Sequence, residues 1–204
     1  MARRADQPDR RDQLLDEALE LVADGGLGAV THRAVERAAG VPHGSVTYHL
    51  GGRDELVDAL IDRMVAACEA EVAVIARDVS MALAGAAGGA DGAGLDVDAV
   101  ADALVRWMDD GRRLHVARFE LELAAARDPR LRERMSRAAA VFWRLCEPIA
   151  LAMGSADPVR DGRAMGAAVD GLLLDRLTHD PEDPAIVRAG VRQLLRSWAP
   201  EPPS

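Results

Sequence analysis

Apolar residues recur every three or four positions along most of this chain, which is the spacing of one face of an α-helix. In the first such stretch, 11–23, Leu14, Leu15, Ala18 and Val22 share one side. Further stretches with this spacing cover residues 53–83, 98–108, 112–127, 131–153, 158–178 and 184–198. Alanine and leucine dominate and runs of β-branched residues are scarce, so the pattern predicts an all-α protein.

Between residues 31 and 50 the helical pattern is short and is interrupted once. Thr31 can cap a first helix by accepting a backbone N–H, and Gly40 ends it where a left-handed residue is easiest to place. Pro42 is then expected to begin a second helix, roughly 42–49, because proline costs little at a helix start. This second helix carries small and polar side chains that can hydrogen-bond to base edges and phosphates in a major groove. The segment therefore predicts a helix-turn-helix that binds DNA.

Three motifs in this region resemble those of one-component bacterial transcriptional regulators of the TetR family. They are Ala39-Gly40-Val41, Val46-Thr47-Tyr48-His49 and Arg53-Asp54-Glu55-Leu56, within a match of about 13–60. The resemblance implies an N-terminal three-helix helix-turn-helix DNA-binding domain and a C-terminal helical ligand-binding and dimerisation domain. The expected boundaries are an arm at 1–10 within a DNA-binding domain at 1–55, a second domain at 56–199, a flexible glycine-rich loop at 85–95 and a tail at 200–204.

The resemblance also implies which side chains contact DNA. In the family, these are the two residues after the capping threonine, the outer positions of the second helix and the basic residue that opens the following helix. The corresponding residues here are His32, Arg33, His43, Gly44, Ser45, Thr47, Tyr48, His49 and Arg53. For Tyr48 and His49 the alternative is a structural role at the hinge of the domain. Gly44 and Leu50 depart from the bulkier and aromatic residues common in relatives, so we expect altered specificity and looser packing under the helix.

The charge of the chain limits the kind of DNA binding to expect. The net charge of −9 argues against a protein that coats DNA without selecting a sequence. Residues 31–53 nevertheless carry three arginines and one glutamate, a net charge of +2. We therefore expect weak non-specific binding and a specificity that depends on a few contacts.

The C-terminal half contains no recognisable catalytic motif, and its histidines lack metal-ligand spacing, so neither an enzyme nor a metal or other cofactor is expected. Its scarce aromatic and polarisable side chains are concentrated on three central helices, which suggests the lining of a largely apolar cavity. Plain core packing is the equally weighted alternative. The candidate ligand-binding residues are Trp107, Met108, His115, Phe119, Phe142, Trp143, Cys146 and Asp170.

The last two helices are expected to form a homodimer interface, because each has a broad apolar surface and glycines that allow close approach. Ordinary packing within one chain is the alternative. The candidate interface residues are Met165, Val169, Leu172, Leu173, Leu177, Val187, Val191, Leu194, Leu195 and Trp198.

Together these features predict a ligand-responsive repressor that leaves a palindromic DNA operator when a small apolar effector binds. A DNA-binding regulator without an effector, and a small-molecule-binding protein that does not bind DNA, are the alternatives. No apolar run is long enough for a membrane span or a signal peptide core, so a cytoplasmic location is expected.

Overall fold

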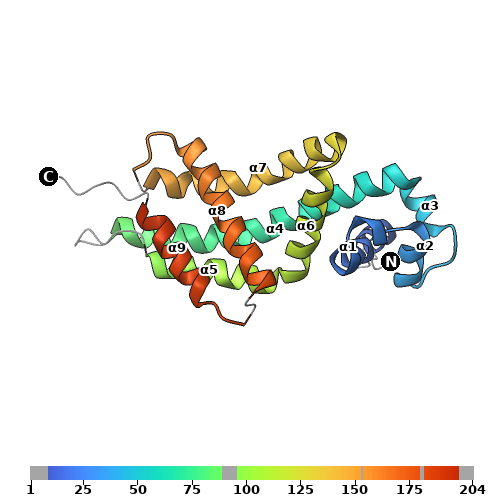
Figure 1. Cartoon of the computed structure of the whole chain (residues 1–204), viewed down its shortest axis with the longest axis horizontal. Coiled ribbons are helices and arrows are strands. Elements are labelled where there is room, and N and C mark those ends of the chain that lie inside the picture. The colour runs from blue at the N-terminus through green and yellow to red at the C-terminus, as the bar shows by residue number, and fades with distance from the viewer. Residues whose placement is uncertain (1–8, 89–95, 153, 180–181, 198–204) are drawn as a thin grey trace, which may run out of the picture. The chain divides into compact units, whose positions relative to one another are not determined.

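The computed structural model describes residues 9–88, 96–152, 154–179 and 182–197. Within these ranges the chain is helical and contains no strand, which confirms the all-α prediction (Figure 1). The elements are α1 (Arg10–Gly25), the 3₁₀ turn η1 (Leu27–Ala29), α2 (His32–Ala38), α3 (Ser45–Leu50), α4 (Arg53–Gly88), α5 (Val97–Asp110), α6 (Arg112–Ala125), α7 (Pro129–Ala152), α8 (Pro158–Thr178) and α9 (Ala185–Ser197). Most of the expected arm, the expected tail and Trp198 lie outside the described residues.

The helices form two compact units. The first comprises the described residues up to Cys68 together with 113–136, and the second comprises 69–112 and the described residues from Arg137 onward. The first unit extends past the expected boundary at 55 because α6 and the first turns of α7 pack with the N-terminal helices. Arg113 of α6, for example, donates to the Glu20 and Asp24 carboxylates of α1 at 2.8 and 2.7 Å.

In the first unit, α1, α2 and α3 surround a small apolar core. Val35, Val46 and Leu50 are each at most 5% exposed, so Leu50 fills the position under α3. The Thr31 hydroxyl accepts from Ala34 N at 3.2 Å, which confirms the predicted cap of α2. Gly40 has φ +63°, as expected for the residue that follows a helix end.

The start of α3 differs from the prediction. Helix α3 begins at Ser45 and not at Pro42, because Gly44 has φ +90° and so cannot lie inside a right-handed helix. Pro42 belongs instead to the preceding turn, where its carbonyl accepts from the Ser45 hydroxyl at 2.6 Å. Gly44 and Ser45 thereby shape the turn into α3.

The second unit is built from α5, α8 and α9 with the later parts of α4 and α7. Helix α9 packs against both α5 and α8. Figure 1 shows α9 lying alongside both helices. The close approach of α8 and α9 requires a glycine, because a Cβ on Gly190 would lie 2.5 Å from Leu172 Cδ2. Arg176, only 5% exposed, donates to both carboxylate oxygens of Asp109 on α5 at 2.7 and 3.0 Å.

One further expectation about a helix end needs correction. Helix α4 continues to Gly88, so residues 85–88 of the expected loop are helical, and residues 89–95 lie outside the described part of the chain. Helix α7 includes Pro148 within its bounds. None of the described helices combines the length and apolar composition needed to cross a membrane.

Candidate DNA-binding and effector sites

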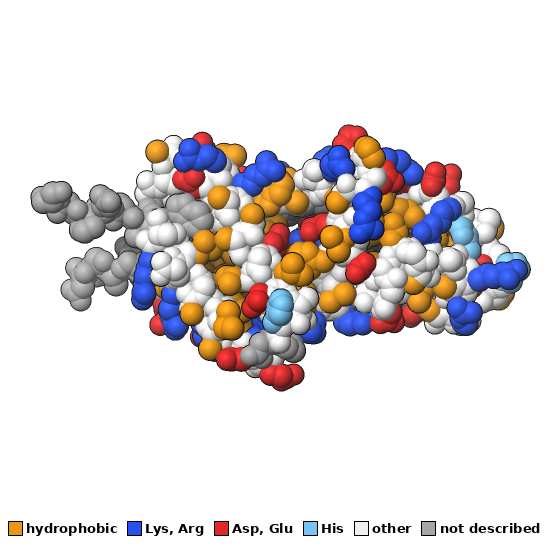
Figure 2. All heavy atoms as spheres, in the orientation of Figure 1, with side chains coloured by type: hydrophobic (Ala, Val, Ile, Leu, Met, Phe, Trp, Pro, Cys, Tyr) orange, Lys and Arg blue, Asp and Glu red, His pale blue; other side chains and the backbone are white. Residues whose placement is uncertain are grey.

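The outer surface of α2 and α3 is polar and strongly exposed. Arg33, Thr47, Tyr48 and His49 are all exposed, and Tyr48 reaches 84%. The Tyr48 and His49 rings meet edge to face with centroids 4.9 Å apart, which gives the Tyr48 ring a defined neighbour without burying it. Figure 2 shows arginine and histidine side chains on the visible surface of this helix pair. The local positive charge expected from the sequence is therefore accessible.

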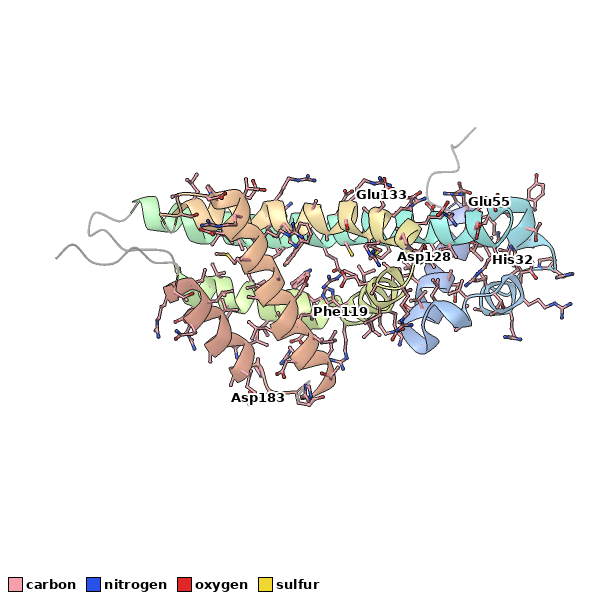
Figure 3. The ribbon with its side chains drawn as sticks, turned by 45° about the horizontal axis from the view of Figure 1, so that its top comes forward. His32, Glu55, Phe119, Asp128, Glu133 and Asp183 are labelled. Carbon is pink, nitrogen blue, oxygen red and sulfur yellow. The ribbon has the colours of Figure 1, made fainter. Side chains whose placement is uncertain are left out.

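His32 and Arg53, which were expected to contact DNA, hold the fold together. His32 Nε2 lies 2.8 Å from the carbonyl oxygen of Gly51, joining the start of α2 to the end of α3, and Figure 3 labels this residue. The Arg53 guanidinium donates to the carbonyl of Val30 and, at 3.0 Å, to that of Leu27. Both side chains thus fix the start of α4 against the preceding turns.

Glu36 is a residue of this site that sequence reasoning missed. It lies on α2, is only 5% exposed, and its Oε1 accepts from Gly44 N at 2.8 Å and Val46 N at 3.3 Å. Its Oε2 lies 3.0 Å from His43 Nδ1. A glutamate directly after the buried Val35 was the available signal, because a carboxylate is costly on a buried face unless it is paired.

The pKa of Glu36 is lowered from its ordinary 4.5, chiefly by the hydrogen bond with His43, while desolvation opposes the shift and the Val46 and Gly44 amides add to it. The ionised carboxylate therefore stabilises the first unit above about pH 4.5, and this contribution is lost as the pH falls through the lowered pKa. We expect Glu36→Gln to be less stable than the wild type at pH 7, with a difference that shrinks below pH 4.5. Thermal unfolding followed by circular dichroism at several pH values measures this, and a difference independent of pH would contradict it.

The second unit encloses a small apolar cavity among α4, α5, α7, α8 and α9. The volume open to the centre of a water molecule is about 30 Å³. Every lining residue is apolar or a cysteine: Ile75, Val79, Val100, Leu104, Phe142, Leu145, Cys146, Ile149, Met165, Val169, Val191, Leu194 and Leu195.

A larger and more open groove runs between α4 and α5. Measured in the same way its volume is about 210 Å³, and Ile75 lines both hollows. Trp107 forms part of its wall and stacks on Phe142, with ring centroids 5.3 Å apart and planes 12° apart. The charged residues of the groove are Glu71, Asp78, Asp110 and Arg106. Its carboxylates outnumber its one arginine, so it favours ligands that carry positive charge.

Comparison with known proteins shows the family of this chain. The family profile described as "Bacterial regulatory proteins, tetR family" matches residues 14–60, and the one described as "Tetracyclin repressor-like, C-terminal domain" matches residues 91–200. The chain belongs to the TetR family of transcriptional regulators. Among curated proteins, none matches it significantly.

Several solved structures resemble this TetR-family chain over nearly its whole length. The multidrug binding protein EbrR, solved with imidazole, is 30% identical, with a TM-score of 0.61 over 97% of this chain and 99% of that one. A TetR-family member from Streptomyces coelicolor is also 30% identical, with a TM-score of 0.60 over 92% and 98%. A TetR-family regulator from Rhodococcus shares the fold at 20% identity, with a TM-score of 0.68 over 93% and 98%.

Of the eight side chains proposed to bind a ligand, the cavity brings together only Phe142 and Cys146. Trp107 stacks on Phe142 from the groove, and Asp170 acts on Cys146 through its charge. Burial, followed by the charges of Asp170 and Glu147, raises the pKa of Cys146 to about 12, so its thiol is a packing group.

The other four proposed ligand residues do not line the cavity, which corrects the prediction. Met108 is 1% exposed in the core of α5. Trp143 instead lies beneath the guanidinium of Arg163, which is 4.4 Å from the ring centroid. His115 and Phe119 belong to the first unit, on α6, where Figure 3 labels Phe119.

Most of the proposed dimer residues lie inside the protomer. Met165, Val169, Leu173, Val187, Val191 and Leu195 are each at most 3% exposed, so they form the core between α8, α9 and their neighbours. Leu172 packs on Gly190 of the same chain, Leu194 lines the cavity, and Leu177 is half-buried. The six buried residues thus face the core of their own chain, because helical spacing does not tell which partner an apolar face meets. The half-buried Leu172, Leu177 and Leu194 stay predicted interface residues.

The exposed apolar residues of α8 and α9 are different ones. Val159, Leu174 and Ile186 are 65%, 46% and 52% exposed, and Gly171 is exposed beside Leu174. Figure 2 shows hydrophobic side chains along α8 and α9 on the face toward the viewer.

Proposed function

We propose that this TetR-family chain is a homodimeric repressor that binds a near-palindromic operator and is released by a small, largely apolar effector. Two recognition helices, about 34–36 Å apart, would lie in successive major grooves. Arg33, His43, Thr47, Tyr48 and His49 are the proposed contacts, and the helix-turn-helix exposes each of these side chains. The 84% exposure of Tyr48, a large ring presented by the recognition helix, is the observation that carries the proposal.

Selection of bound sequences from a random DNA pool by the purified protein tests DNA binding. A palindromic consensus bound far more tightly than random DNA supports the proposal. A folded protein that enriches no sequence would overturn it in favour of a small-molecule-binding protein that does not bind DNA.

Tyr48→Ala is expected to weaken binding to the selected operator about tenfold for each half-site, the equivalent of one good contact to a base edge or phosphate. Fluorescence anisotropy with labelled operator measures the change. Leu123→Ala is the matched control, because Leu123 is 55% exposed on α6 of the same unit and is not a proposed contact. Equal affinities for Tyr48→Ala and the control would contradict a DNA-contacting role for Tyr48.

The α4–α5 groove supports an effector that is flat, mostly apolar and positively charged. Its supporting features are the Trp107 ring and the carboxylates of Glu71, Asp78 and Asp110. EbrR has also been solved with proflavin and with malachite green, which makes proflavin, a planar aromatic cation, a suitable probe. The enclosed cavity, with only about 30 Å³ open to the centre of a water molecule, is small for an effector, which favours the second candidate, a regulator without an effector.

Proflavin fluorescence titrated against the protein, with Trp107→Ala as the comparison, separates these two candidates. Saturable binding that is lost in Trp107→Ala and lowers operator affinity supports the effector proposal. An effect on operator affinity of about 5- to 150-fold corresponds to ordinary coupling between two sites. Helix α4 is the proposed coupling element, because its residues 53–68 belong to the first unit and 69–88 to the second.

A further inference from the structure

The contact between Glu36 and His43 determines which hydrogen-bonding atom His43 presents on the exposed surface of the helix-turn-helix. An ionised carboxylate can only accept hydrogen bonds. Because Glu36 Oε2 lies 3.0 Å from His43 Nδ1, that nitrogen must carry the proton of the bond. In a neutral imidazole the other nitrogen, Nε2, is then a bare acceptor. The buried glutamate thus decides which hydrogen-bonding group the exposed histidine offers.

The two side chains involved differ sharply in exposure. The Glu36 side chain is 6% exposed and is held by two backbone amides of the turn into α3, whereas the His43 side chain is 81% exposed. The carboxylate is therefore fixed by the fold, and the ring it orients is presented to whatever α3 meets. A buried group with fixed partners can impose one tautomer on an exposed ring, as carboxylates do for histidines at metal sites.

We infer that Glu36 is a specificity-determining positioning residue, which holds His43 in the Nδ1–H tautomer so that Nε2 accepts a hydrogen bond from a DNA base. In the major groove the exocyclic amines of cytosine and adenine are donors, whereas guanine, through N7 and O6, and thymine, through O4, offer only acceptors. The neutral His43 therefore selects cytosine or adenine at the position it contacts and disfavours guanine and thymine. This inference rests on the proposed DNA-binding function of α2 and α3.

Glu36→Gln reverses the arrangement with almost no change in shape. The oxygen of the substituted amide replaces Oε1 and accepts from Gly44 N and Val46 N, so the amide NH₂ occupies the place of Oε2 and donates to His43 Nδ1. Nδ1 must then be bare, and Nε2 carries the proton. The expected result is a change of preference at one base position in each half-site, from cytosine or adenine to the bases without an exocyclic amine in the major groove, guanine and thymine, by about fivefold.

Two measurements test the inference at pH 8.5, where an ordinary histidine is neutral. Nitrogen-15 NMR of the His43 ring, without DNA, is expected to show the Nδ1–H tautomer in the wild type and the Nε2–H tautomer in Glu36→Gln. The same tautomer in both proteins overturns the inference. Sequence selection with both proteins is expected to show the change of base preference. Identical consensus sequences would show that His43 Nε2 does not recognise a DNA base.

Two control variants separate reading from folding. Glu36→Ala removes the orienting group without supplying a donor, so it is expected to lose the preference at this position without gaining one for guanine or thymine. His43→Ala is expected to remove the preference in both backgrounds. If the tautomer reverses but the protein selects no DNA sequence, the proposed function and base recognition by His43 are overturned. The NMR result would still establish that Glu36 determines the tautomer of the His43 ring.

Discussion

Leu174→Glu is expected to make the protein monomeric and to lower its affinity for the selected operator by about 10²- to 10⁴-fold. The size of the effect follows from avidity, because a monomer loses the second half-site that a dimer engages at high effective concentration. Leu174 is 46% exposed on α8 beside the exposed Gly171, so a charge there spares the core of the protomer. In a closely packed interface the same charge would be desolvated without a partner.

Light scattering after size-exclusion chromatography measures the assembly, and anisotropy with labelled operator measures the affinity. Leu123→Glu is the matched control, since it places the same charge on a similarly exposed leucine of α6. A dimeric Leu174→Glu protein with unchanged operator affinity would show that this face of α8 is not the interface. Loss of the dimer and of operator affinity in both Leu174→Glu and Leu123→Glu would indicate misfolding, which circular dichroism detects.

Asp109→Ala is expected to lower the free energy of unfolding by about 2–3 kcal/mol, below the range for fully buried ion pairs because Asp109 is half-exposed. The loss comes mainly from Arg176, which is 5% exposed and would keep its charge in the core without its bidentate partner. For a protein of this size the melting temperature should fall by about 5–10 °C. Differential scanning calorimetry at one protein concentration measures the shift.

A comparable ion pair with an exposed arginine provides the control. Asp78 also joins two helices of the second unit, but its partner Arg106 is 58% exposed, so Asp78→Ala should cost less than about 1 kcal/mol. The double variant Asp109→Ala, Arg176→Met is expected to recover most of the lost stability, because it removes the buried charge itself. Equal losses for Asp109→Ala and Asp78→Ala would contradict the role of burial.

The helix-turn-helix could be predicted closely because its signals are local. The Thr31 cap and the left-handed Gly40 act within a few residues, so the chain specifies them wherever the segment folds. The error at the start of α3 was also local in origin. Pro42 is compatible with a helix start and with a turn, and the left-handed Gly44 selects the turn.

The contacts inside the site could not be read from the sequence, because they join residues far apart along the chain. His32 bonds to Gly51 and Arg53 to Val30, so two expected DNA contacts serve the fold. Glu36 was overlooked for the same reason, since its partners lie seven to ten residues away across a turn. A polar side chain looks equally available for DNA or for a backbone partner until the fold is known.

The sequence by itself determined the helices, their approximate limits, the helix-turn-helix and the resemblance to TetR regulators. These features depend on periodicity, caps and short motifs, which involve only residues close together in the sequence. Only the tertiary structure decided what each apolar face meets. Val169 and Leu173 point into the core while Leu174, one residue later, is exposed. A helix repeats its faces every 3.6 residues whether it packs within its own chain or on another, so the choice between core, cavity and interface belongs to the packing of whole helices.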